Sequence, residues 1–260
     1  MTAAVVVMIL VTMTYANGVL SSRLAENEFS TNKQFMRTTG LQIDDIAWTI
    51  GRTQTVRYSS QYGNMKFQNS TVTYDIQVDR GSGMEPFLTV TTGIIMFNMP
   101  VVSYSIGNNH FERVSPSSSD SFLQEGPAAP VAHVFCVEKL PMDDGSYIRV
   151  VAVPSVRKLD STITGSGSSA NYTKFYLPSL IDSGDHPYLS QSITMTGSDV
   201  FKNVQSGVES VQITVSFPNA TEGFDNELFK FEDVSETVTL FPNSIVEFYV
   251  GTVVVTLGKV

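Results

Sequence analysis

The first 22 residues, Met1–Ser22, contain no charged side chain, and residues 2–16 are almost continuously apolar. Exposing such a stretch to water is unfavourable, because apolar surface is driven out of contact with solvent. No lysine or arginine precedes the segment, so it does not show the basic start of a secretory signal peptide. We therefore expect a hydrophobic N-terminal helix that is buried either by lipid or by copies of itself.

The helical pattern continues beyond the apolar segment, through residue 52. All eleven prolines lie after residue 85, and apolar residues recur at three- and four-residue spacing between Ile43 and Ile50. A continuous helix of this length would span about 75 Å at 1.5 Å per residue. Residues 39–42, Thr-Gly-Leu-Gln, resemble a capping box, so a kink or a restart of the helix at this point is the alternative.

After Arg52 the apolar pattern changes to period two, which is typical of half-buried antiparallel strands. The clearest examples are residues 71–78 and 211–217, and further strands are expected at 53–58, 87–92, 94–98, 101–106, 131–139, 147–153, 190–195, 235–240, 245–250 and 252–257. Turn residues at 143–145 and 241–244 separate neighbouring strands, and the Ser-, Gly- and Pro-rich stretches 115–130 and 162–173 are expected to be surface loops.

This pattern predicts an α+β fold in two parts. Residues 1–52 form a long N-terminal hydrophobic helix, the stalk of a lollipop-shaped subunit, and residues 53–260 form an antiparallel β-sandwich head. Trp48 is the only tryptophan, and we expect it to pack the stalk against the head.

The net charge of −9 lies entirely in residues 53–260, because the preceding residues contain four acidic and four basic side chains. An acidic head repels phosphate backbones, so we expect it to make no contact with nucleic acid. The single cysteine, Cys136, lies in an apolar run and is expected to be a buried, inert thiol. An extracellular protein of this composition would be stable without internal disulfides.

An apolar N-terminal helix that runs into an amphipathic one, followed by an acidic Ser/Thr-rich β-domain, resembles the archaeal type IV pilin-like proteins, including the archaeal flagellins. The resemblance covers the whole architecture and is strongest in residues 1–50. It implies that a peptidase removes a basic leader, that the helices pack into a filament core, and that the heads cover the outside. Bacterial pilins usually place a glutamate at the fifth mature position, where this chain has Val5.

A helix that is apolar on all sides can also be buried without reference to any family, since identical copies can pack side by side. A contact that does not close on itself propagates into a helical filament. The expected role is a structural subunit of an extracellular type IV pilus-like filament that serves adhesion to surfaces, with the membrane as partner before assembly. The assembly helix would act through Val5, Val6, Val7, Ile9, Leu10, Val11, Val19, Leu20, Leu24 and Phe29.

Three alternatives remain open at the level of sequence. The same filament architecture would serve motility, as in an archaellum. The apolar segment is also close to the length of a single membrane anchor, which would make the head a cell-surface binding module. Cleavage of a secretory signal after Ala16 is the third possibility.

Signals of catalysis are weak, so we expect neither enzyme activity nor a cofactor. The histidines, His110, His133 and His186, do not have the spacing of metal ligands, and His133 is interpreted as a structural residue of a strand. Residues 182–186, Asp-Ser-Gly-Asp-His, read more readily as a turn than as a calcium loop, because the full ligand spacing is missing. No phosphate-binding loop and no Gly-X-Ser-X-Gly motif occurs.

Three Asn-X-Ser/Thr sequons occur in the head, at Asn69, Asn171 and Asn219. A chain this rich in serine and threonine produces several sequons by chance, so the number alone carries no weight. Their location outside the stalk is compatible with glycosylation of an extracellular surface.

Overall fold

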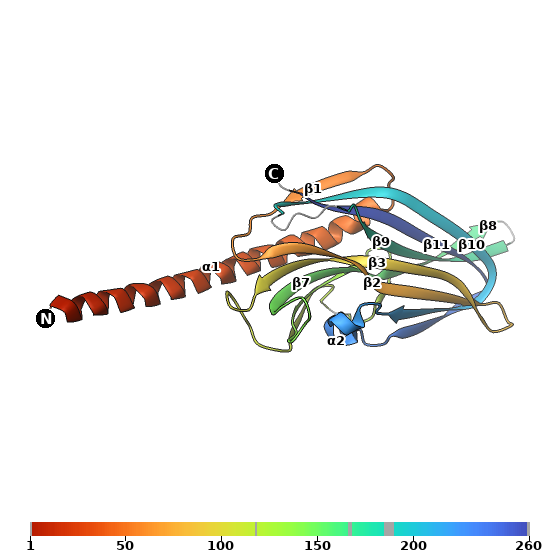
Figure 1. Ribbon diagram of the computed structural model, residues 1–260. Helices are drawn as coiled ribbons and strands as arrows, with labels where there is room; N and C mark the ends of the chain where they lie inside the picture. Colours follow the sequence, from red (N-terminus) through yellow and green to blue (C-terminus); the bar gives the residue numbers. More distant parts are fainter. Residues whose placement is uncertain (1, 118, 166–167, 185–189, 259–260) are drawn as a thin grey trace.

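In the computed structural model, which describes residues 2–117, 119–165, 168–184 and 190–258, one long helix enters a β-domain from one end (Figure 1). Helix α1, Thr2–Ala47, has 46 residues and runs without interruption through Gly40. The kink considered for residues 39–42 is therefore absent. At 1.5 Å per residue the helix is about 69 Å long. Its first half projects from the head, whereas its second half lies against the sheet (Figure 1).

In the described part of the chain, eleven strands form one sheet in the order β4-β6-β7-β3-β2-β10-β11-β9-β8-β5, with β1 paired to β10 beside this path. A short 3-10 helix, η1 (Ala220–Glu222), and helix α2 (Asn226–Phe229) lie between the last two strands. The strands are β1 Thr53–Arg57, β2 Asn64–Asp79, β3 Met84–Pro100, β4 His110–Ser115, β5 Leu123–Glu125, β6 Ala132–Glu138, β7 Tyr147–Pro154, β8 Val156–Gly165, β9 Ser168–Asp182, β10 Ser192–Ser216 and β11 Ser235–Gly258.

The sheet curls until strands that are distant in the pairing order meet again. The Ser179 hydroxyl on β9 donates to the Thr91 carbonyl on β3 (2.9 Å), and the Leu180 amide donates to the Thr92 hydroxyl (2.9 Å). Three strands, β2, β10 and β11, separate β3 from β9 along the sheet. The layered head is thus one curled sheet whose halves face each other across a core.

The predicted class, a long apolar helix followed by a β-domain, is confirmed, but the pairing is not wholly antiparallel. Strand β11 pairs with β9 in parallel, and so does β5 with β8. The remaining pairs are antiparallel, so the domain is mostly antiparallel and mixed. Sequence periodicity could not reveal this, because alternation reports which face is buried and not the direction of the neighbouring strand.

Strands β6 and β7 are buried on both faces, because each lies between two apolar clusters. On β6, Val134 and Cys136 contribute to the cluster that contains α1, whereas Phe135 and Val137 contribute to the cluster enclosed by the curled sheet. This explains the unbroken apolar run in the sequence, since a strand covered on both sides shows no polar alternation. The second half of α1 contributes Ala25, Phe29, Met36, Ile43, Ile46 and Ala47 to this packing.

Glycines allow the helix to approach the sheet closely. A Cβ atom at Gly40 would lie 2.6 Å from Val134 Cγ2, and one at Gly251 on β11 would lie 2.3 Å from the Ala47 carbonyl oxygen. A Cβ atom at Gly197 on β10 would likewise lie 2.6 Å from the Ile46 carbonyl oxygen. These distances are below ordinary van der Waals contact, so side chains at these positions would push the helix away from its seat.

Several of the expected local elements differ in the structure, among them the expected loop 115–130, which contains strand β5. Residues 241–244 are not a hairpin turn but a bulge within β11, where Val208 pairs with Ser244 and Ser210 with Thr239. Residues 162–165 and 168–173 belong to strands β8 and β9 and not to a loop, as shown by the pairing of Thr162 with Asn171. Residues 101–106 are a loop and not a strand. The turn predicted at residues 143–145 does connect β6 to β7.

Candidate assembly surface

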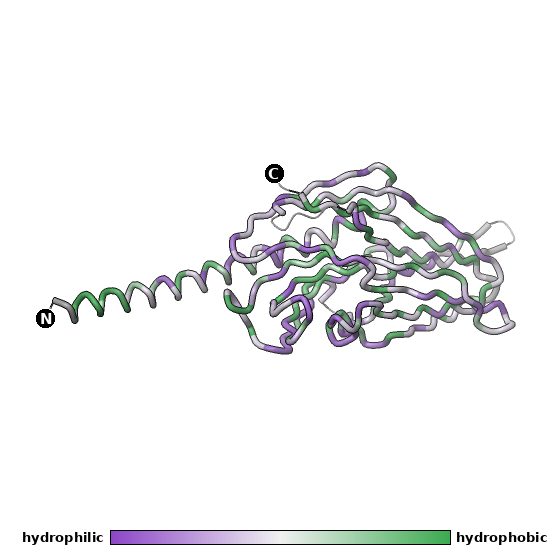
Figure 2. Tube along the Cα trace, viewed as in Figure 1, coloured by the Kyte–Doolittle hydropathy of each residue, from purple (hydrophilic) through white to green (hydrophobic). Residues whose placement is uncertain are grey.

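The projecting half of α1 is uncovered on every side. Residues 5–11 each expose between 53% and 66% of their surface, although all seven are large and apolar. Figure 2 shows the same segment as a hydrophobic stretch of helix outside the head. The projecting residues 5–20 are called the rod. Among the described residues, α1 is the one helix that is long and apolar enough to cross a membrane, judged by length and composition. An N-terminal helix of this kind points to membrane insertion or secretion.

Hydroxyl groups within the rod already have partners inside the helix. Thr12 donates to the Met8 carbonyl (2.8 Å), and Thr14 donates to the Leu10 carbonyl (2.9 Å). Such bonds to the preceding turn satisfy the donors without water. Residues 5–14 can therefore be buried among apolar groups without leaving a hydroxyl donor unpaired, which would be costly.

The transition from exposed to covered helix occurs within a few residues. Val19, Leu20 and Leu24 are 46%, 58% and 45% exposed, whereas Phe29 is 3% exposed. The Phe29 ring packs between Phe97 and Tyr104 of its own head, with centroid distances of 6.4 and 5.4 Å. Of the residues expected to form the assembly helix, all but Phe29 are exposed in the single subunit.

The Glu28 carboxylate ties the root of the rod to the head. Its oxygens accept hydrogen bonds from the Ser60 hydroxyl (2.6 Å) and from the backbone amides of Gln61 (2.7 Å), Tyr62 (3.1 Å) and Gly63 (2.9 Å). Charge-assisted bonds of this type are stronger than those between neutral groups. The β1–β2 loop is thus fastened to the helix where the helix leaves the head.

Ion pairs and aromatic contacts fix the rest of the embedded half. Lys33 donates to both oxygens of Glu112 on β4 (2.8 and 3.0 Å), and Arg157 on β8 donates to Asp44 (2.7 Å). The Trp48 indole donates to Asp44 (2.7 Å), and its ring meets the Tyr176 ring edge-on at 5.2 Å. The expectation that Trp48 packs the helix against the head is confirmed. The rod therefore extends from a firmly held base.

Two of the three sequons lie together on the head. Asn69 is exposed at an irregularity of β2, and the Asn219 side-chain amide donates to the Asn69 carbonyl oxygen (3.3 Å). Asn171 lies elsewhere, on the β8–β9 hairpin, where its side-chain oxygen accepts a hydrogen bond from the Thr162 hydroxyl (3.0 Å). All three are at least partly accessible, and none lies on the helix.

Two titratable side chains of the core, His133 and Cys136, have pKa values shifted by burial. Burial, followed by the nearby Arg113 charge, lowers the pKa of His133 to about 4. Burial also raises the pKa of the Cys136 thiol to about 12, so the thiol is protonated and unreactive at neutral pH. No group of three or more His, Cys, Asp or Glu side chains suited to a metal occurs among the described residues. His186, with the end of the possible calcium turn, lies outside them.

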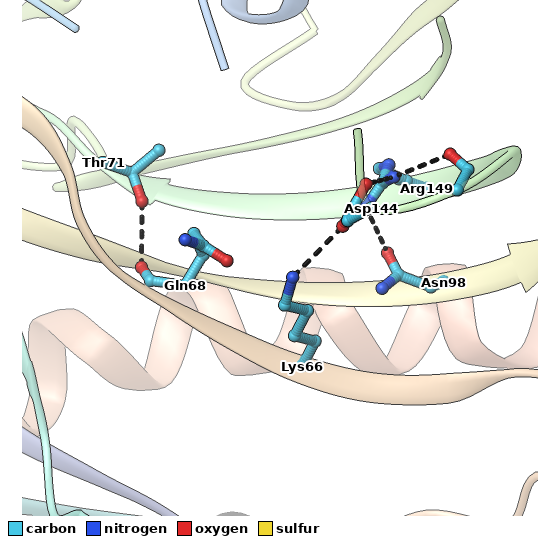
Figure 3. A network of polar contacts seen from close by, with 7 residues as sticks. Lys66, Gln68, Thr71, Asn98, Asp144 and Arg149 are labelled. Atoms are coloured by element: carbon cyan, nitrogen blue, oxygen red, sulfur yellow. Dashed lines mark hydrogen bonds and ion pairs between the residues drawn. The ribbon is translucent and has the colours of Figure 1, made fainter. Parts of the chain in front are cut away.

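A second polar cluster, shown in Figure 3, holds the β6–β7 turn. Arg149, 1% exposed, donates to Asp144 (3.0 Å) and to the Asn98 side-chain oxygen (3.2 Å), while Lys66 also donates to Asp144 (3.1 Å). Burial opposes ionisation of Asp144, but the hydrogen bond and charge of Arg149 hold the pKa of that carboxyl below its usual value. This network anchors the turn, and the buried Arg149 Nε atom has no hydrogen-bond partner among the described residues.

Comparison with known protein families, with curated proteins and with solved structures finds no match to this chain. Its architecture is consistent with a pilin-like subunit, namely a long apolar N-terminal helix followed by a large β-domain. The exposed rod is the surface that most needs a partner, because it is the longest uncovered apolar stretch of the described chain.

Proposed function

We propose that this chain is a structural subunit that polymerises through the projecting half of α1 into a filament on the outside of the cell, used for surface adhesion. One observation carries the proposal: a single continuous helix is uncovered and mainly apolar over residues 5–20, whereas over residues 25–47 one of its faces is buried in the head. A projecting apolar helix on each subunit lets many heads surround a core of packed rods. The role requires no catalytic residue, no cofactor and no bound metal.

The energetics favour association of the rods. Burying ~1,500 Å² of apolar surface per rod at ~25 cal/mol per Å² yields tens of kcal/mol before the entropy of association is subtracted. A head of net charge −9 attached to each rod prevents the copies from collapsing into a compact aggregate, because the heads repel one another. Side-by-side rods in a staggered, non-closing contact then extend into a helical polymer.

Storage in the membrane before assembly fits the same surface. The internally bonded threonines of the rod suit a lipid environment as well as a bundle of helices. We therefore propose the cytoplasmic membrane as the reservoir of subunits. A protein that stayed there permanently would instead be an anchored cell-surface module, and this is the competing function that the experiment must separate.

Electron microscopy of material sheared from producing cells tests the proposal. Filaments that contain the intact chain are expected for the parent sequence, and Val7→Asp is expected to abolish them while its head remains folded. A charge at this position would be unpaired among the packed rods. If shearing releases no filament and all of the chain stays in the membrane fraction, the anchored module is correct. Loss of attachment without loss of swimming, in cells that lack the chain, would support adhesion over motility.

A further inference from the structure

The loop formed by residues 101–109 lies at the end of the head from which the rod emerges. Strand β3 ends at Pro100 on that side, and the chain crosses below the helix before it enters β4 at His110 (Figure 1). The loop contacts the root of the rod directly, because the Tyr104 ring lies 5.4 Å from the Phe29 ring. The loop therefore borders the exposed part of α1.

A buried carboxylate holds this loop in a defined shape. Glu138 on β6 is 1% exposed, and it accepts hydrogen bonds from the Ser105 hydroxyl (2.6 Å) and from the amides of Ile106 (2.9 Å) and Gly107 (3.1 Å). Burial opposes its ionisation, but these donors outweigh burial and keep the pKa of Glu138 below its usual value. A loop fixed in this way loses little entropy when a partner covers it.

The fixed loop presents apolar side chains to solvent. Val102 is 97% exposed and Ile106 is 44% exposed. Loop tips are usually polar, and an anchored loop has no need of a fully exposed valine for its own folding. An apolar side chain held in place at full exposure, next to a larger uncovered apolar surface, is the usual mark of an interface.

The composition of the loop identifies its partner. Residues 100–109, Pro-Val-Val-Ser-Tyr-Ser-Ile-Gly-Asn-Asn, contain no charge, whereas the head as a whole carries the net charge of −9. Copies of an acidic head repel each other at most surfaces, and a charge-free edge is where a second copy can approach at the smallest electrostatic cost. Continuity with the rod brings the loop of each copy close to its neighbour once the rods gather.

We infer that residues 101–109 form a second contact between copies of this chain, in which Val102 packs against the adjacent subunit of the filament. This inference rests on the proposed polymerisation through the rod. The rod supplies most of the buried area, and the loop fixes how neighbouring heads sit on the core. A contact at the base of the head would make the polymer stiff and would define its spacing.

Val102→Asp in the full-length chain tests this contact. Because Val102 is almost fully exposed, the melting temperature of the head should not change, whereas the yield of sheared filaments should fall at least tenfold and unassembled chain should accumulate in the membrane. Ile163→Asp is the matched control: Ile163 is 60% exposed on the β8–β9 hairpin, at the far end of the head from the rod (Figure 1), and the substitution should leave the yield unchanged. Val102→Leu keeps an apolar side chain at this position and should assemble with the yield of the parent chain.

The comparison with Val7→Asp separates the two proposals. If Val7→Asp prevents filaments but Val102→Asp assembles with normal yield and normal resistance to shear, the loop contact is wrong and the filament proposal stands. If Val7→Asp also assembles normally, both proposals are wrong. Loss of filaments in Ile163→Asp as well would show that any added charge on the head blocks assembly, which would equally overturn a specific role for the loop.

Discussion

The two halves of α1 have the same secondary structure but opposite surroundings. Ile9 in the first half is 53% exposed, whereas Ile43 in the second half is fully buried against the sheet. Residues 5–11 of the first half are apolar on all sides, and the second half presents apolar residues on one face and polar ones such as Arg37 on the other. One helix thus contributes to two cores: the core of its own head, and, in the proposed filament, a core shared among copies.

The largest effect should come from placing a charge in either half of the helix. Ile43→Asp would bury an unpaired carboxylate and should lower the free energy of head unfolding by about 4 kcal/mol or more. Ile9→Asp is the matched change and should leave head stability unaltered, while it prevents assembly. Urea unfolding of the full chain in detergent micelles measures both. Equal losses of stability would mean that the exposed half also supports the head.

Acid should affect the head but not the rod, because Thr2–Ser22 contain no side chain that titrates between pH 4 and 7. His133 has its pKa lowered to about 4, so between pH 6.5 and 4 the unfolded chain binds a proton that the folded head does not. Stability therefore falls as the pH decreases through this window, by up to ~3 kcal/mol.

Thermal unfolding at several pH values, with His133→Gln and His110→Gln compared, isolates this contribution. The first variant should lose the dependence between pH 6.5 and 4, and the second should retain it. An unchanged slope in His133→Gln would place the proton uptake on another group.

Substitution of a glycine that contacts the buried half of α1, and of one in the exposed half, compares how tightly the backbone is packed in the two halves. Gly251→Ala introduces a Cβ atom 2.3 Å from the Ala47 carbonyl oxygen and should destabilise the head by about 2 kcal/mol through overpacking. Gly18→Ala meets no atom within 4 Å in the subunit, and it should strengthen the helix by up to ~1 kcal/mol. Circular dichroism and urea unfolding of the two variants report the difference. A Gly251→Ala chain as stable as the parent would show that the helix end can shift away from β11.

Which of these features the sequence could predict depends on how local their causes are. The long helix follows from apolar residues that recur as far as Ile50 and from the absence of proline before residue 86, and the Asp143–Gly145 turn follows from its own residues. Strand β11 continues through the bulge at residues 241–244 because its partner β10 is also long and bent, which no local pattern reveals. The parallel pairing of β9 with β11 joins strands that β10 separates in the sequence, and no local pattern reveals it either.

The proposed contact surfaces also include features with local causes, which the sequence predicts, and features that depend on distant residues, which it does not. The sequence predicts an assembly helix whose apolar residues between Val5 and Leu24 need a partner, and these side chains are exposed in the subunit. It does not predict that Phe29 is covered by its own head, because Phe97 and Tyr104 are distant in the chain. Residues 101–106 of the loop are predicted as a strand, since Val101, Val102, Tyr104 and Ile106 have high strand propensity. Its shape is imposed by Glu138, which satisfies the loop amides in place of a strand partner.

The smallest effect concerns the boundary between the two halves, where Glu28 fastens the β1–β2 loop. Glu28→Ala leaves the amides of Gln61, Tyr62 and Gly63 without their acceptor and should lower the free energy of unfolding by about 1–2 kcal/mol. Glu26→Ala is the neighbouring control, because the exposed pair of Glu26 with Arg23 contributes less than ~0.5 kcal/mol.

Hydrogen exchange at residues 60–63 distinguishes a local from a global effect of Glu28→Ala. Faster exchange confined to this loop, with the rest of the head protected, means that the carboxylate sets the point at which the rod leaves the head without holding the head together. The boundary between the exposed and the buried half of α1 would then be set by the few hydrogen bonds of Glu28 to the β1–β2 loop. If exchange instead increased throughout the sheet, the two halves of α1 would be coupled, and assembly of the rods would be expected to stabilise every head in the polymer.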